Sequence, residues 1–176
     1  MNFGLPNQAL ERTGLSRWVW PWGFWFAHIS SPVAQLYWSF GRVMTPRQKS
    51  QVQEMKRAAI EDMVSYMKYG GADSEKDPDY DPTFDAGYTQ KHVDRCAKII
   101  SAYLDALGGM RGSGKEQKIL SEAKKAVLGL NKLNKECDGS LIETDQREQI
   151  CKLMIIAAKH AGLRYDGDFT EEWREW

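Results

Sequence analysis

The stretch TPRQKSQVQEMKRAAIEDMVSYMKYGG, residues 45–71, contains the start, the buried face and the end of one helix. Thr45 offers a side-chain oxygen to the free N–H groups of a first turn, and Pro46 suits the first helical position because no N–H is needed there. Apolar residues then recur every three or four positions and so share one face. That face comprises Val52, Met55, Ala59, Ile60, Met63, Val64 and Met67. Gly70-Gly71 favours a left-handed end, so we expect a helix over about 46–69.

Three further segments show the same apolar spacing between capping signals. We expect helices at about 90–107, 114–136 and 145–161. Their expected caps are Thr89 and Gly108-Gly109 for the first, a capping box of Ser113 and Glu116 for the second, and Thr144 and Gly162 for the third. No stretch alternates as a strand would. The sequence therefore predicts an all-α protein, a compact four-helix bundle domain at 44–163 followed by an acidic tail at 164–176.

The first 43 residues differ in composition from the rest of the chain. They hold five of the seven tryptophans, and RWVWPWGFWF occupies residues 17–26. Proline and glycine interrupt the uncharged stretch, and aliphatic residues are few, which disfavours a membrane span. A membrane-surface anchor over 17–41 stays open as an alternative. Trp22 and Trp25 are candidates for contact with a partner, because large rigid side chains dominate binding energy.

The opening of the chain suggests that residues 1–43 are an extension of uncertain origin. PNQALERTG, residues 6–14, resembles leaders on unrelated bacterial hypothetical proteins, which arise when a start site is assigned too far upstream. Met44 stands one residue before the first helix cap. We therefore expect the functional domain to begin at about Met44.

Charge and cysteine content narrow the class of function. The chain has 24 basic and 24 acidic residues and no net charge, whereas a nucleic-acid binder needs a cationic surface to neutralise phosphates. The three cysteines are widely spaced and offer neither a disulfide framework nor a CxxC pair. We expect a cytoplasmic protein without a signal peptide that does not bind nucleic acid.

Between the first two expected helices lies ADSEKDPDYDPTFDAGY, residues 72–88, with six acids and one lysine. Its prolines and lack of periodicity predict a loop. Acids interleaved with aromatics suit contact with a basic partner, and the candidate residues are Asp77, Asp79, Tyr80, Asp81, Phe84 and Tyr88. A calcium loop starting at Asp77 needs glycine sixth and glutamate twelfth, but Pro82 and Tyr88 stand there. A looser divalent-cation site, and whether the loop is ordered, stay open.

The stretch GMRGSGKE, residues 109–116, fits the phosphate-binding pattern G-x-x-x-x-G-K through Gly109, Gly114 and Lys115. A true P-loop follows a buried strand and has Ser or Thr after the lysine to hold magnesium. Here a helix is expected before the loop, and Glu116 follows the lysine. A turn between two helices explains the same residues, so a phosphate or nucleotide site is retained as an alternative only.

No group of residues indicates catalysis or a resident metal. His92 and Cys96 lie four apart on one expected helix and could share a metal, but nothing nominates further ligands and Cys96 falls on the apolar face. No nucleophile is paired with a base. We expect no catalytic residue, no metal and no cofactor.

Residues 128–163 read LGLNKLNKECDGSLIETDQREQICKLMIIAAKHAGL. The LN-x-x-CDG turn, the LIETDQRE helix entry and the AA-x-x-AGL ending resemble an uncharacterised family of small all-helical bacterial domains. Such families have no established activity, so no site residue carries over. Their frequent position beside toxin or phage-defence genes implies an immunity-like role by analogy.

Taken together, these patterns favour a non-catalytic bacterial helical domain that binds another protein. The partner's identity and the oligomeric state, with a homodimer among the options, stay open. Nucleotide binding through Lys115 and membrane-surface attachment through 17–41 are the alternatives.

Overall fold

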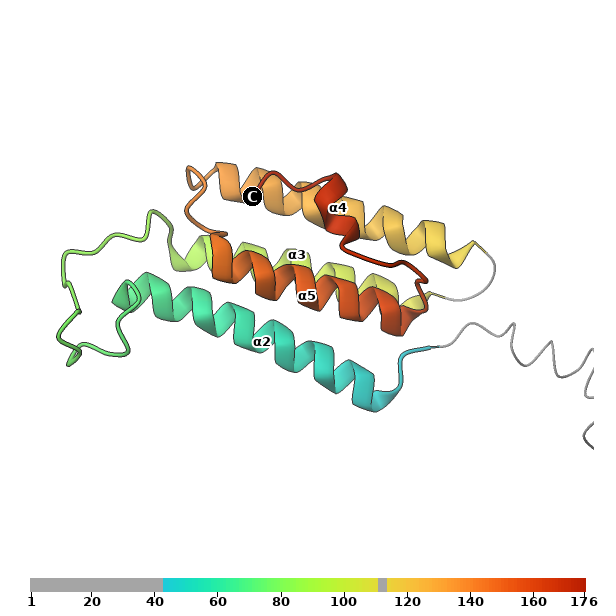
Figure 1. Ribbon diagram of the computed structural model, residues 1–176, viewed down its shortest axis with the longest axis horizontal. Coiled ribbons are helices and arrows are strands. Elements are labelled where there is room, and N and C mark those ends of the chain that lie inside the picture. Colours follow the sequence, from blue (N-terminus) through green and yellow to red (C-terminus); the bar gives the residue numbers. More distant parts are fainter. Residues whose placement is uncertain (1–42, 111–113) are drawn as a thin grey trace, which may run out of the picture. The chain divides into compact units, whose positions relative to one another are not determined.

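The computed structural model describes residues 43–110 and 114–176, and these form four α-helices and one 3-10 turn. The elements are α2 (Pro46–Tyr69), α3 (Gln90–Gly109), α4 (Lys115–Lys135), α5 (Thr144–Ala161) and η1 (Phe169–Glu172). Within the described ranges there is no strand, which confirms the expected all-α class. Successive helices run in opposite directions along the bundle (Figure 1).

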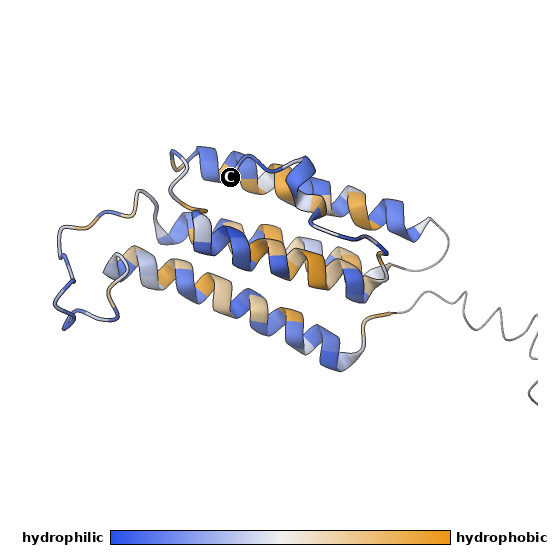
Figure 2. Ribbon diagram, viewed as in Figure 1, coloured by the Kyte–Doolittle hydropathy of each residue, from blue (hydrophilic) through white to orange (hydrophobic). Residues whose placement is uncertain are grey.

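The four helices surround one apolar core. α3 packs against α2, α4 and α5, and α2 packs against α5 as well. Apolar and hydrophilic residues interchange along each helix (Figure 2), and the apolar ones supply most of the buried side chains. Fully buried side chains from the four helices in turn include Met63, Ile100, Ile119 and Leu153. The bundle predicted from helical spacing is therefore confirmed, because each stripe can leave water only by facing the others.

The ends of α2 and α5 form as their capping residues predict. Gln48 donates its N–H to Thr45 Oγ1 (3.2 Å) and accepts the Thr45 N–H on its own side chain (2.8 Å), which makes a reciprocal capping box. Gly70 ends α2 at φ 63°, in the left-handed region. At the end of α5, Leu163 donates its N–H to the Ala158 carbonyl (2.9 Å) behind Gly162, as in a Schellman cap.

Two predicted helix ends are corrected by the structure. α4 takes Gly114 as its N-cap, and Ser113, expected to form a capping box there, lies outside the described residues. α5 begins one residue earlier than expected, because Gln146 accepts the Glu143 N–H (3.3 Å) and makes Glu143 the cap in place of Thr144. α3 continues through the Gly108-Gly109 pair, ends at Gly109 and has the extended residue Met110 as its C-cap.

The segment 164–176, expected as an acidic tail, packs against the bundle. η1 lies on α4, and Phe169 is only 2% exposed. Trp173 and Trp176 also pack against the core. The hydrophobic core therefore extends beyond residue 163.

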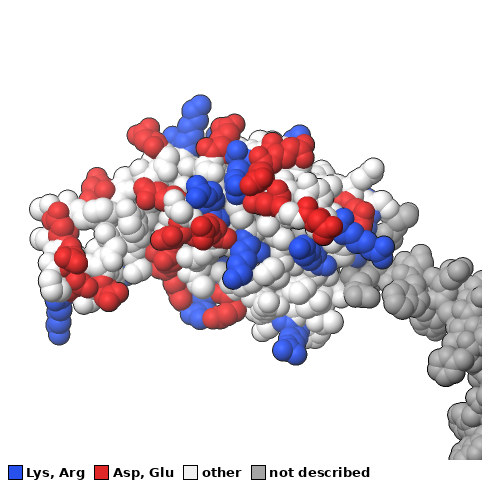
Figure 3. Space-filling view, in the orientation of Figure 1, with Lys and Arg blue, Asp and Glu red and all other residues white. Residues whose placement is uncertain are grey.

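The described helices carry charge on their outer faces. Acidic and basic side chains alternate over most of the visible face, but carboxylates predominate at the end of the bundle formed by the loop between α2 and α3 (Figure 3). Among the described helices, none has the length and apolar content needed to cross a bilayer.

Candidate functional surface

The loop between α2 and α3, residues 72–88 and here called the acidic loop, is held in shape by three of its own aspartates. The N–H groups of Asp79 and Asp73 donate to the two carboxylate oxygens of Asp77 (3.0 and 3.2 Å), and these bonds lower the pKa of the Asp77 carboxyl. The hydroxyl and N–H of Thr83 likewise donate to Asp81 (2.7 and 2.8 Å) and lower its pKa. These short side-chain to backbone bonds fix consecutive turns.

The third aspartate, Asp85, accepts the Gly87 N–H (2.9 Å). Gly87 itself has φ 73°, and a Cβ there would come within 2.9 Å of the Ser140 hydroxyl. Only glycine suits both the backbone angle and that close approach. The acidic loop is therefore ordered just before α3 begins.

The aromatic residues of the acidic loop point back onto the last turns of α2. The Tyr80 ring meets Tyr69 edge-on (centroids 6.3 Å apart), and the Phe84 ring meets Tyr66 in the same way (5.4 Å). Tyr88 donates its hydroxyl to the Met63 carbonyl (2.9 Å). We call these three contacts the aromatic ladder. It fastens the acidic loop to α2 at three points.

The aromatic ladder changes the role of one predicted contact residue. Tyr88, expected at a partner surface, is only 5% exposed and belongs to the core. Burial raises the pKa of its hydroxyl. Phe84 is half-buried against Gly70, where an added Cβ would lie 2.8 Å from the ring. Of the three aromatic candidates, Tyr88 is therefore a core residue.

The side chains of the remaining three acids of the acidic loop play no part in holding its turns. The carboxylates of Asp73, Glu75 and Asp79 are exposed and accept no hydrogen bond from any described residue. They belong to the acidic end seen in Figure 3, and Lys76 is the one cation of the acidic loop. This division leaves three carboxylates able to bind a cationic partner without loss of loop structure.

The described residues contain no group of three or more His, Cys, Asp or Glu side chains placed to hold a metal ion. His92 accepts the Thr89 N–H (3.1 Å) at the start of α3. Cys96 is fully buried, and burial raises the pKa of its thiol to about 12. A thiol in that state remains protonated and packs as a small apolar group.

The P-loop-like turn lies between two helices, with residues 111–113 outside the described part of the chain. Gly109 is the last residue of α3, so a helix precedes the turn where a P-loop requires a strand. Gly114 caps α4 in the left-handed region. The Lys115 ammonium lies over Gly162 at the end of α5, 3.0 Å from where a Cβ would stand. A cation at that place is stabilised by the negative, C-terminal end of the α5 dipole.

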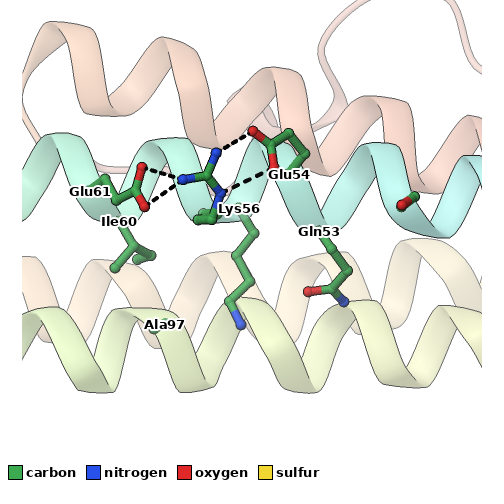
Figure 4. A pocket seen from close by; sticks show the side chains of 8 residues that line it. Gln53, Glu54, Lys56, Ile60, Glu61 and Ala97 are labelled. Carbon is green, nitrogen blue, oxygen red and sulfur yellow. Dashed lines mark hydrogen bonds and ion pairs between the residues drawn. The ribbon is translucent and has the colours of Figure 1, made fainter.

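An open groove lies between α2 and α3, and the Lys56 side chain extends from α2 toward α3 (Figure 4). Lys56 reaches across from α2 and donates to Ser101 Oγ (2.6 Å), while Arg57 on the same helix pairs with Glu54 and Glu61. The Ser101 hydroxyl in turn donates to the Ala97 carbonyl (2.7 Å). In this arrangement Lys56 is placed as a donor to the Ser101 oxygen, and the hydroxyl proton points to the Ala97 carbonyl. A nucleophilic serine needs the opposite arrangement.

Sequence reasoning missed the polar residues that join the segment 164–176 to the bundle. Asn131 is 8% exposed and lies inside α4, where it bonds to the main chain of that segment at Trp173 and Glu175. The sequence did contain a signal for it. Asn131 and Asn134 are polar, but they continue the helical spacing of the apolar residues Val127 and Leu130 in α4. Polar side chains at buried positions require partners. The predicted contacts Trp22 and Trp25 lie outside the described residues.

Comparison with known proteins gave no relative: no protein-family description, no curated protein and no solved structure matches this chain.

Proposed function

We propose that this protein is a non-catalytic protein-binding module and that the acidic loop contacts a basic surface of its partner. The observation that supports this is the division among the six acids of the loop. Asp77, Asp81 and Asp85 hold its turns. The carboxylates of Asp73, Glu75 and Asp79 stay exposed and have no hydrogen-bond or ion-pair partner among the described residues.

A loop that is already ordered binds at a lower entropic cost. The aromatic ladder fixes the acidic loop on α2, so its exposed carboxylates do not have to be ordered when a partner arrives. Complementary charge then speeds association and selects among partners. An immunity or defence role is a more specific form of this proposal and rests on the resemblance of residues 128–163.

The test is a charge-neutral variant of the full chain, Asp73→Asn, Glu75→Gln and Asp79→Asn. Proteins captured from extracts of the native host by wild type and variant are compared by mass spectrometry, at low salt and at about 0.5 M salt, where the Debye length is only a few ångströms. We expect a partner with a basic surface that is retained by the wild type at low salt, released at high salt and lost from the variant.

The matched control is Asp105→Asn, Glu148→Gln and Asp166→Asn, which removes the same charge from exposed positions outside the acidic loop. It must retain the partner. Equal capture by the variant and the wild type, with both folded by circular dichroism, would contradict the proposal.

A further inference from the structure

The segment 164–176 occupies a groove formed by α4 and α5. Phe169 is buried there, and Trp173 and Trp176 pack against the core beside it. The three aromatic residues stand at i, i+4 and i+7 of a segment whose helical part is confined to η1. η1 covers Phe169–Glu172, and just beyond it the Arg174 N–H donates to the Thr170 carbonyl (3.0 Å). The segment thus sits in the groove as a peptide ligand would.

Asn131 in α4 holds the main chain of that segment with both ends of its amide. Its Nδ2 donates to the Trp173 carbonyl (2.8 Å), and its Oδ1 accepts the Glu175 N–H (3.2 Å). Hydrogen bonds to main-chain groups hold a bound segment by its backbone and do not depend on which side chains it carries at those positions. α5 contributes Cys151, which contacts the Thr170 hydroxyl at 3.3 Å.

Charge also matches between the groove and its occupant. Two of the six lysines of α4, Lys124 and Lys135, lie beside the segment. Lys124 lies over the Trp173 ring, 5.7 Å from its centroid, and Lys135 lines a hollow together with Glu175 and Trp176. Glu171, Glu172 and Glu175 are exposed on the occupant. The groove therefore suits an acidic aromatic peptide.

Two features make the resident segment able to leave. The indole N–H groups of Trp173 and Trp176 are buried with no acceptor among the described residues, which weakens the attachment. The connection from α5 is exposed over residues 164–167, and Gly167 is at φ 98° with open space around it. This connection lies outside α5, so a change of backbone angle there leaves the helix intact.

We propose that the α4–α5 groove is a peptide-docking site, and that the segment 164–176 of a second copy of this chain enters it by exchange with the resident one. A second copy is the natural occupant because its segment carries every contact described above. This surface is separate from the acidic loop, so each of the two proposals can be tested without the other. Exchange of an identical element between copies needs no new interface.

The test uses a full-length receptor with a weakened resident segment, Trp173→Ala with Trp176→Ala, and a fluorescent peptide of residues 164–176. Anisotropy should show the peptide binding at least tenfold more tightly to this receptor than to the wild type, whose own segment competes at high effective concentration. Adding Asn131→Ala to the receptor should weaken binding by about tenfold through the loss of two hydrogen bonds. A control peptide with alanine at 169, 173 and 176 should not bind.

Absence of saturable binding to a receptor that is folded by circular dichroism overturns the proposal, as does equal binding to the Asn131→Ala receptor. Sedimentation equilibrium decides the occupant: the wild type should form a dimer with rising concentration and the receptor variant should not. Peptide binding without a wild-type dimer overturns the second copy as occupant. If the receptor does not fold, hydrogen exchange of the wild type decides, since the amides of 173–175 must exchange faster than those of α3, and equal rates overturn the proposal.

Discussion

At the scale of single residues, the hydroxyl of Tyr88 connects the acidic loop to the backbone of α2. It donates to the Met63 carbonyl at 2.9 Å inside the core. Tyr88→Phe keeps the ring but leaves that buried carbonyl without this donor, so we expect a loss of about 1–2 kcal/mol in the free energy of unfolding. Urea denaturation measures it. Tyr165→Phe is the control, because Tyr165 is exposed, and it should change little; equal effects of the two substitutions would contradict this role.

Because the Cys96 thiol is buried, we expect the free energy of unfolding to decrease at alkaline pH. Burial raises its pKa from 9.0 to about 12. The native state therefore keeps a proton that the unfolded state loses above pH 9, so the contribution is fully present below pH 9 and is lost as the pH rises toward 12. The slope is about 1.4 kcal/mol per pH unit in that window. Urea denaturation at pH 7 and pH 10 should show a smaller decrease for Cys96→Ala than for the wild type, and identical decreases would count against this account.

At the scale of elements, the junction between α2 and the acidic loop depends on Gly70. Its φ of 63° strains any other residue, and a Cβ would meet the Phe84 ring at 2.8 Å. Gly114 has a similar φ of 70° but nothing within 4 Å. Gly114→Ala should therefore cost about 1–2 kcal/mol from backbone strain alone. Gly70→Ala should cost more, measured by thermal unfolding. Equal costs would show that Phe84 does not press on this turn.

The helices could be predicted from sequence because each has a periodic stripe and at least one clear cap. The bounds of α2 match the expectation. The errors lie where two residues compete for one cap, as Glu143 and Thr144 do, or where glycines continue a helix, as Gly108 and Gly109 do. Local spacing cannot show which hydrogen bond prevails there, since tertiary contacts such as that of Gln146 with Asp62 (2.8 Å) contribute to the choice.

At the scale of the whole molecule, the bundle itself was predictable and the direction of its loop aromatics was not. Four apolar stripes require a common core, whichever loops join them. By contrast, Tyr80, Phe84 and Tyr88 recur every four residues in a segment that its prolines exclude from a helix, so this spacing does not separate an inward from an outward side chain. Their positions follow from contacts with α2 residues distant in sequence. The packing of Phe169 could not be predicted either, because a short segment of mixed polarity has no periodic apolar face.

The central claim of this account is that the acidic loop is a rigid surface with its aromatics turned inward and its carboxylates outward. Nuclear Overhauser effects between ring protons in the full-length protein test it most directly. We predict cross-peaks between Tyr66 and Phe84 and between Tyr69 and Tyr80, whose ring centroids lie 5.4 and 6.3 Å apart. Backbone order parameters of the acidic loop should be about 0.85, as in rigid backbone. Absence of both cross-peaks, with order parameters below about 0.6 across the loop, would contradict the account.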